Sequence, residues 1–168
     1  TVLDPPGETE RFNSEKLIRL DRTFYCYRGR AIEPSPAPRN DFMTFASLNS
    51  PFKMSGAAIE LWSRVLAEVP NSRLIVPAPL AEPQRMIDRF ARHGVPVDRL
   101  DLLPRQPFES YLRAYDRIDI ALDTVPYNGG VTTCDALWMG VPVVSLRGDT
   151  SVGRAGASIL SAMALTEL

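Results

Sequence analysis

Short hydrophobic runs alternate with longer amphipathic segments along most of this chain. The runs are short and aliphatic, as expected of buried strands. They lie at 42–48, 74–76, 100–103, 118–122 and 141–146. Between the runs, hydrophobic positions such as Ile59, Trp62 and Leu66 fall near a helical period. These segments predict helices over 57–69, 83–93, 108–117, 132–139 and 152–165.

This alternation indicates a parallel sheet, because a helical crossover joins each strand to the next parallel one. We therefore predict an α/β fold, a doubly wound Rossmann-like parallel sheet with helices on both faces. Residues 1–40 lack the alternation, and the proline-rich stretch 34–38 disfavours a helix or a central strand. We predict that residues 1–40 form a linker or strap from a preceding lobe and that 41–168 form the α/β domain.

The composition is that of a soluble globular protein. The chain has 168 residues, of which 45% are hydrophobic and 23% charged, which is enough for one domain with a substantial core. A net charge of −1 gives no electrostatic reason to expect nucleic acid or an anionic membrane as a partner. No apolar run approaches the roughly 20 residues of a membrane span. The first residue is not Met, so we expect a piece of a longer protein.

Few residues offer nucleophilic or metal chemistry. Cys26 and Cys134 have no metal-like spacing, and we expect free thiols in a reducing compartment. The only histidine, His93, follows a helical pattern and is expected at a helix end on the surface. The sequence therefore predicts neither a nucleophile triad nor a metal cluster. Three aspartates flank the strand 118–122 and are expected in helix-end and turn roles: Asp116, Asp119 and Asp123.

One strand-to-helix connection has the features of a phosphate site, at the sheet edge where ligands of this fold bind. Gly129 and Gly130 permit close backbone approach and positive φ. Thr132 or Thr133 is placed to cap the following helix, whose first-turn N–H groups suit a diphosphate. Asp135 is placed to accept hydrogen bonds from ribose hydroxyls. An ordinary glycine turn with a threonine cap and a first-turn acid explains the same residues equally well.

Two further residues are candidates for the same site. Lys53 follows the first predicted strand, so it would lie at the same edge of the sheet and could neutralise phosphate. A solvated loop lysine is the alternative. Tyr111 could stack on a base, or serve as a core aromatic residue.

The motifs around these residues resemble glycosyltransferase family 41, the O-linked N-acetylglucosamine transferases and their bacterial relatives, which carry TPR repeats upstream. The block from Asn128-Gly129 to Trp138-Met139-Gly140 is specific. Weaker matches lie at 4–8, 14–17, 49–53, 61–62, 69–72, 122–124, 140–142, 148–149 and Arg154. The resemblance implies a GT-B architecture, in which a UDP-sugar lies between two Rossmann-like lobes. It identifies 41–168 as the UDP-sugar-binding C-terminal lobe.

The resemblance also implies roles for individual residues. Lys53 matches a lysine that contacts the diphosphate and would stabilise the leaving group. Asn128, Gly129, Gly130, Thr132 and Thr133 belong to the donor-binding block, in which Thr132 matches a threonine at the start of the phosphate-binding helix. Asp135 matches the ribose acid, and Tyr111 falls where the animal enzymes carry a uracil-stacking histidine. Three positions depart from the animal pattern: Ser50 replaces a glutamine, and Gly130 and Val131 replace His-Thr.

The implied activity is transfer of N-acetylglucosamine, or another hexose, from UDP to a protein Ser or Thr. The implied donor is a UDP-sugar, with no metal or other cofactor, and the implied location is cytoplasmic, with upstream TPR repeats and an N-terminal lobe in the intact chain. Because most of that lobe is missing, we expect this chain alone to bind UDP weakly and not to turn over. Two alternatives remain: a non-catalytic interaction module, suggested by Val131 and Tyr111, and glucosylation of Asn.

Overall fold

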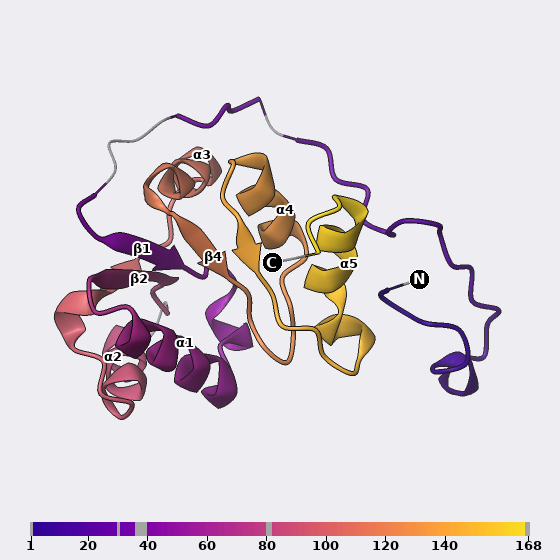
Figure 1. Ribbon diagram of the computed structural model, residues 1–168, viewed down its shortest axis with the longest axis horizontal. Coiled ribbons are helices and arrows are strands. Elements are labelled where there is room, and N and C mark those ends of the chain that lie inside the picture. Colours follow the sequence, from indigo (N-terminus) through magenta and orange to yellow (C-terminus); the bar gives the residue numbers. More distant parts are fainter. Residues whose placement is uncertain (1, 30, 36–39, 80–81, 167–168) are drawn as a thin grey trace.

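The computed structural model describes residues 2–29, 31–35, 40–79 and 82–166, and it has the predicted α/β fold. A five-stranded, all-parallel sheet runs in the order β3-β2-β1-β4-β5 (Figure 1). The strands are β1 (Met43–Ala46), β2 (Ser72–Pro77), β3 (Leu100–Leu103), β4 (Ile120–Leu122) and β5 (Val143–Val144). The helices are α1 (Gly56–Glu68), α2 (Pro83–Ala91), α3 (Phe108–Arg113), α4 (Val131–Trp138) and α5 (Ala155–Ala162).

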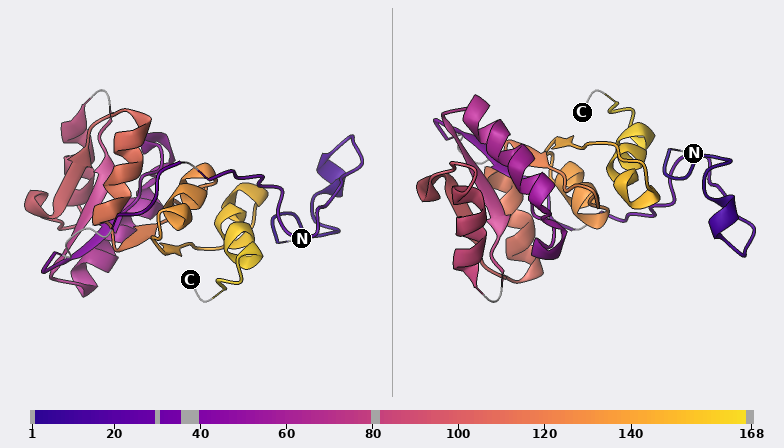
Figure 2. Two further views of the ribbon diagram at one scale, coloured as in Figure 1. Left: turned by 90° about the horizontal axis from the view of Figure 1, so that it is seen from above. Right: turned by 90° about the horizontal axis from the view of Figure 1, so that it is seen from below.

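Helices cover both faces of the sheet (Figure 2). Successive strand residues point to opposite faces, so Leu74 packs with α1 and α2, whereas Ile75 packs with α3 and α4. On the first face, Trp62 of α1 and Phe90 of α2 are fully buried. The two apolar layers fix the position of each strand end and, with it, the loops that carry the site.

Local sequence signals account for most element boundaries. The side chain of Ser55 caps α1 by accepting a hydrogen bond from Ala58 N at 3.0 Å. Gly94 and Gly140, after α2 and α4, have φ of +78° and +77°, the left-handed conformation in which glycine commonly ends a helix. The predicted last helix starts later than expected, because a 3₁₀ turn over Ser151–Gly153 precedes it.

Two other predicted elements are shorter in the structure. The predicted helix 108–117 ends as α3 at Arg113 and continues as a 3₁₀ turn over Ala114–Arg117. The predicted strand 141–146 pairs only at Val143–Val144, at the edge of the sheet, where a single neighbouring strand holds it. Pro142, which has no N–H group to donate, precedes the paired residues.

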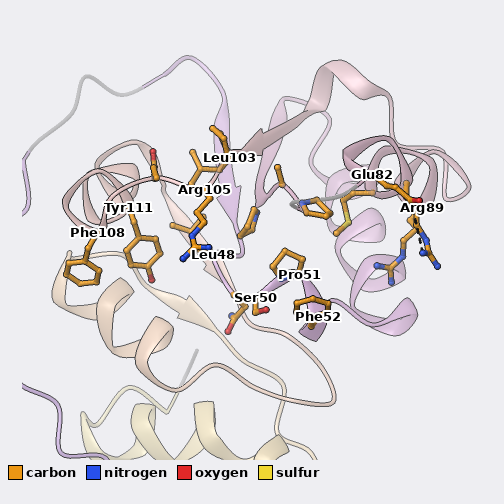
Figure 3. Close-up of a pocket in the computed structure, with 18 residues that line it drawn as sticks. Leu48, Ser50, Pro51, Phe52, Glu82, Arg89, Leu103, Arg105, Phe108 and Tyr111 are labelled. Carbon is orange, nitrogen blue, oxygen red and sulfur yellow. Dashed lines mark ion pairs between the residues drawn. The ribbon is translucent and has the colours of Figure 1, made fainter.

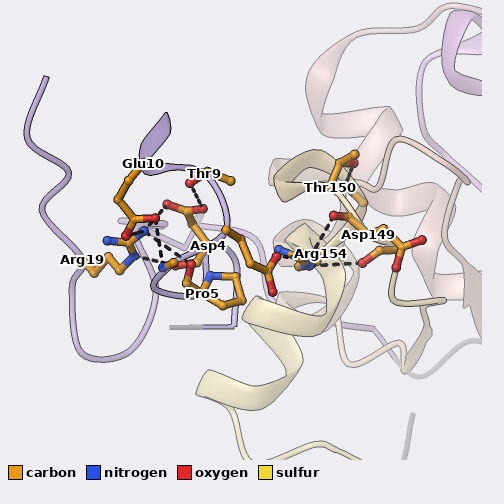
Figure 4. A network of polar contacts seen from close by, with 12 residues as sticks. Asp4, Pro5, Thr9, Glu10, Arg19, Asp149, Thr150 and Arg154 are labelled. Atoms are coloured by element: carbon orange, nitrogen blue, oxygen red, sulfur yellow. Dashed lines mark hydrogen bonds and ion pairs between the residues drawn. The ribbon is translucent and has the colours of Figure 1, made fainter. Parts of the chain in front are cut away.

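The later part of the N-terminal segment passes α5 and α4, whereas its first part, with a 3₁₀ turn at Glu10–Phe12, extends away from the domain beyond α5 (Figure 1); the described part of the segment contains no strand. The indole of Trp138 donates to Ile32 O at 3.2 Å, and a Cβ on Gly29 would be 2.3 Å from that ring. The buried Arg154 forms an ion pair with Glu8 at 2.6 Å (Figure 4). We call residues 23–29 and 31–35 the strap. Its origin in a preceding lobe stays a prediction, and much of the proline-rich run lies outside the described residues.

Over the residues described above, no helix is both long and apolar enough to span a membrane.

Truncation of the largest buried core side chain should destabilise the domain strongly. Trp62 is 1% exposed, so Trp62→Ala should lower the free energy of unfolding by about 3–5 kcal/mol through lost burial and a residual cavity. Leu61, the preceding residue, is 36% exposed, and Leu61→Ala should cost less than about 1 kcal/mol. Urea denaturation checks both variants, and equal losses would contradict the assigned core.

Candidate functional site

The loops that follow β1 and β4 meet at the point where the strand order reverses. From β1 the chain moves toward β2 and β3, and from β4 it moves the other way to β5, which makes this a topological switch point. Lys53, after β1, donates from Nζ to Asn128 O at 2.9 Å. Thr132 Oγ1 donates to Asn49 Oδ1 at 2.8 Å, so a second bond joins the loops. The structure therefore brings Lys53 and the glycine loop to one edge, where the sequence placed them.

The buried carboxylate of Asp123 organises the loop after β4. Its Oδ1 accepts from Thr124 N at 2.8 Å and from Gly129 N at 2.6 Å, and its Oδ2 accepts from Ser145 Oγ at 2.7 Å. Burial raises the pKa of Asp123, and the three hydrogen bonds and Lys53 oppose that rise. The turn role expected for this residue is confirmed. Sequence reasoning missed that one side chain closes the whole loop, because no sequence pattern shows that the loop turns back and brings Gly129 to Asp123.

Close packing explains the paired glycines. A Cβ on Gly129 would lie 2.6 Å from Thr133 Oγ1 and 2.7 Å from Thr132 Oγ1, so a side chain there would collide with the helix start. The prediction of positive φ is wrong for both residues: neither is among the positive-φ glycines, and Gly130 has φ −122°. Asn128, 1% exposed, supports the loop by donating from Nδ2 to Thr124 O at 2.9 Å.

The first turn of α4 begins without a side-chain cap. Gly130 occupies the N-cap position, and the predicted threonine cap is wrong, because Thr132 bonds to Asn49 and Thr133 is buried. The first N–H groups of a helix have no partner within it, and they carry the positive end of its dipole. Val131, the first helical residue, is 57% exposed, so this turn is open on one side. Such a helix start can accept an anion.

Lys53 is held against the loop. Its ammonium group lies 4.2 Å from the centre of the Tyr127 ring, in addition to its bond to Asn128 O. Partial burial lowers the pKa of Lys53, and the nearby Asp123 opposes that shift. The alternative of a solvated loop lysine is therefore not what the structure shows.

Tyr25 of the strap covers the start of α4. A Cβ on Gly130 would be 2.8 Å from Cε1 of Tyr25 and 2.9 Å from its hydroxyl oxygen. The tyrosine ring therefore leaves no room for a side chain at position 130. Sequence reasoning missed Tyr25, because no periodic pattern connects the strap with the helix.

Asp135 lies deeper than the sequence indicated. It is the fifth residue of α4 and only 2% exposed. Its Oδ1 accepts from Tyr27 Oη at 2.7 Å, and its Oδ2 accepts from Tyr111 Oη at 3.1 Å. The structure therefore joins two candidates, Asp135 and Tyr111, through a direct bond that the sequence did not indicate.

A pocket of about 970 Å³ opens at the carboxyl ends of β1, β2 and β3 (Figure 3). Tyr111 and Phe108 stand at one end of it, with ring centres 5.8 Å apart, and Arg89 lies at the other end. Tyr111 also packs against the core, as the second interpretation expects, and its stacking on a base stays a prediction. The pocket is next to the start of α4, since Asn49, which accepts a hydrogen bond from Thr132, lines it together with Ser50.

The thiols fit the expectation of free cysteines, Cys26 exposed and Cys134 buried. Burial and the neighbouring Asp135 raise the pKa of Cys134 to about 11, so it stays protonated at neutral pH. His93 is exposed beyond the end of α2, as predicted. Within the described ranges, no group of three or more His, Cys, Asp or Glu side chains is arranged to hold a metal ion.

Comparison with known proteins identifies related sequences and structures. Residues 36–168 match the model of "Glycosyl transferase family 41". The probable UDP-N-acetylglucosamine–peptide N-acetylglucosaminyltransferase SPINDLY of Arabidopsis thaliana is 37% identical over 180 residues, which cover 100% of this chain and 19% of that protein. A mutant O-GlcNAc transferase of Thermobaculum terrenum superposes with a TM-score of 0.92 at 35% identity, over 100% of this chain and 33% of that one.

These relatives are much longer than this chain, which spans about a fifth of the length of the plant proteins. A more distant structure, the GtfA/B complex, shows the same fold alone, with a TM-score of 0.51 and 18% identity over 73% of this chain.

Asp123 should tolerate amidation but not truncation. Asp123→Ala leaves the buried N–H groups of Thr124 and Gly129 without their acceptor and should lower the free energy of unfolding by at least about 2 kcal/mol. Asp123→Asn keeps an acceptor oxygen and should be at least as stable as wild type at neutral pH.

The pH dependence of the free energy of unfolding distinguishes the wild-type protein from Asp123→Asn. Because the folded state raises the pKa of Asp123, it binds a proton more readily than the unfolded state, and this carboxyl contributes less stability as pH rises through the shifted range. Denaturation at several pH values should show that this fall is absent in Asp123→Asn. An identical fall in that variant would contradict the assigned pKa direction.

A Cβ at position 130 should displace Tyr25. Gly130→Ala should cost about 1–3 kcal/mol of unfolding free energy, through overpacking against the ring. In a Tyr25→Ala background the same change should cost less than about 0.5 kcal/mol. A double-mutant cycle by urea denaturation measures the coupling between positions 25 and 130. Additive effects would contradict the contact of the Tyr25 ring with position 130.

Proposed function

The chain belongs to glycosyltransferase family 41, and on that premise we propose that it is the nucleotide-sugar-binding lobe of a protein glycosyltransferase. The single observation that carries the proposal is the bond from Lys53 to Asn128 O, in the loop that leads into α4, across the β1–β4 switch point. In open α/β sheets, ligands bind at this location. The plant relatives are named for UDP-N-acetylglucosamine and peptide, and we propose a UDP-sugar donor and a protein Ser or Thr acceptor here.

The diphosphate of the donor would lie at the amino end of α4. The uncapped first turn supplies N–H donors and the positive end of the helix dipole, and Lys53 supplies a cation from the opposite loop. Gly129 and Gly130 bring the loop close to the helix start, since the hydroxyls of Thr132 and Thr133 and the ring of Tyr25 take up the space of a Cβ. Asn128 and Asp123 hold the loop in place, because Asn128 donates to Thr124 O and Asp123 accepts from Gly129 N.

The nucleobase would enter the pocket beside this loop. Tyr111 and Phe108 offer partly exposed ring faces there, and flat aromatic surfaces suit a base. Asn49 and Ser50 line the same pocket and belong to the same loop as Lys53, so the proposed base and diphosphate positions are continuous.

The chemistry assigned to this lobe is stabilisation of the leaving group. When an acceptor hydroxyl attacks the anomeric carbon, its oxygen bonds to that carbon and its proton passes to a base of the intact protein. The bond from the carbon to the diphosphate oxygen breaks, and UDP departs with both electrons. Negative charge grows on the diphosphate, where Lys53 and the α4 amides are already in position, so they stabilise the transition state more than the ground state. We propose that this arrangement, and not a metal, carries the charge.

The remaining parts of the catalytic unit belong to the longer protein. We propose an N-terminal lobe that completes the cleft, upstream TPR repeats and a cytoplasmic location, in keeping with the family resemblance. The transferred sugar would be N-acetylglucosamine or another hexose. This chain alone would bind UDP weakly and not turn over, because one lobe of the cleft is missing.

Removal of the Lys53 ammonium should impair transfer. In the intact protein, Lys53→Ala should lower kcat for transfer of radiolabelled sugar from UDP-N-acetylglucosamine to protein by about 100-fold or more, because the leaving group loses its cation. The chain contains only one other lysine, Lys16, which is exposed in the N-terminal segment. Lys16→Ala is therefore the charge-matched control and should transfer sugar like wild type.

Two results would argue against the proposal. Equal activity of Lys53→Ala and wild type would remove Lys53 from the mechanism. Binding of UDP without sugar transfer by the wild-type protein would favour a non-catalytic interaction module.

A further inference from the structure

Tyr127 is a large aromatic residue that the core of the domain does not use. It is 50% exposed, and within the described residues it belongs to neither of the two hydrophobic clusters that pack on the sheet. It lies in the loop between β4 and α4, one residue before the carbonyl group that accepts from Lys53. Core packing therefore gives this ring no role, whereas its contact with Lys53 does.

The ring of Tyr127 forms a wall beside the ammonium group of Lys53. Nζ lies 4.2 Å from the ring centre, inside the range of about 6 Å over which a ring face attracts a cation. The same nitrogen donates to Asn128 O at 2.9 Å, so two adjacent residues hold it. That bond uses one of the three N–H donors of the ammonium group, which can therefore bind a phosphate oxygen without leaving its position.

The backbone on both sides of this ring is fixed. The hydroxyl of Thr124, a fully buried residue, donates to Tyr127 O at 2.6 Å, and Asn128 N donates to Val152 O at 3.0 Å. The ring is therefore attached to an ordered loop, although it borders solvent. An ordered ring is a suitable support for a lysine side chain, whose several rotatable bonds make it costly to hold in one conformation.

An aromatic ring can hold a cation without neutralising it. A carboxylate in the same place would cancel most of the lysine charge, whereas a ring face attracts the ammonium group through its quadrupole and carries no net charge. Partial burial is the largest cause that lowers the pKa of Lys53, and Asp123 opposes that shift. The ammonium group is thus partly shielded from water, which strengthens its attraction to a phosphate.

We infer that Tyr127 is a positioning residue, whose ring holds the Lys53 ammonium group beside the loop that leads into α4, ready for the diphosphate. The inference rests on the proposed function and deepens it. A cation that is already ordered stabilises the charge that develops on the leaving group without being reoriented first. The sequence gave no sign of this support, because the pairing of positions 53 and 127 depends on the meeting of two loops.

Calorimetric titration of the intact protein with UDP tests this role. Tyr127→Leu removes the aromatic face and should raise the Kd for UDP about threefold to tenfold, the effect of one lost cation–π contact. Tyr127→Phe keeps the ring and should retain most of the affinity. Lys53→Ala should also raise the Kd, and Tyr127→Leu added to Lys53→Ala should raise it no further, because the ring then has no cation to hold.

Phe42 offers a matched control. Its ring centre lies 4.7 Å from the guanidinium carbon of Arg73, and it comes directly before β1, at the end of the strand opposite to the Lys53 loop. Phe42→Leu removes a cation–π contact of the same kind and should leave the Kd for UDP unchanged.

Three results would overturn the inference. The first is a wild-type Kd for Tyr127→Leu. The second is an equal rise in Kd with and without Lys53, because the ring would then act on something other than the ammonium group. The third is an equal loss in Tyr127→Phe and Tyr127→Leu, which would assign the effect to the hydroxyl.

Thermal melting checks that the variants are folded. Should Tyr127→Leu fail to fold, Tyr127→Met, which also lacks an aromatic face, replaces it in the same titrations. Failure of the wild-type protein to bind UDP would instead remove the proposed function itself, and the role of Tyr127 with it.

Discussion

The candidate site depends on the burial of one carboxylate at the end of β4. Asp123 accepts from the amide of its neighbour Thr124 and from the amide of Gly129, which is close to it only because the loop curls back over the strand end. That closure sets where α4 begins, and it brings Asn128 O within reach of Lys53. The charge is costly to bury, and its hydrogen bonds and the neighbouring lysine offset that cost. Without this acceptor, the loop would expose unpaired amides in the interior.

The strap contacts the helix of the candidate site at three points. Tyr25 covers Gly130, Tyr27 bonds to Asp135, and the backbone at Ile32 accepts from Trp138. These contacts all fall on α4, the helix whose amino end is proposed to hold the diphosphate. A segment without regular structure therefore determines which face of that helix stays open. This arrangement explains why glycine precedes the helix.

Hydrophobic periodicity was sufficient to predict the architecture. Five strands and five helices follow the predicted order, because runs such as Leu74–Val76 and stripes such as Ile59–Trp62–Leu66 are local consequences of burial. The boundaries at Val143–Val144 and Arg113 were not predictable, since edge pairing and helix tightening depend on tertiary neighbours. Within the site, the family resemblance supplied roles for Lys53 and Asp135, but the positions of their partners required the fold. The two tyrosines bonded to Asp135 come from separate segments, the strap and α3, and no spacing in the sequence relates them.

The central claim is that the amino end of α4 and Lys53 together hold a diphosphate. A crystal structure of the intact protein with UDP bound tests it most directly. The account predicts phosphate oxygens within hydrogen-bonding distance of the backbone amides of Val131 and Thr132 and of Lys53 Nζ, with the loop closed on Asp123. A diphosphate bound away from α4, or a helix start filled by the Tyr25 ring in the presence of bound UDP, would contradict it.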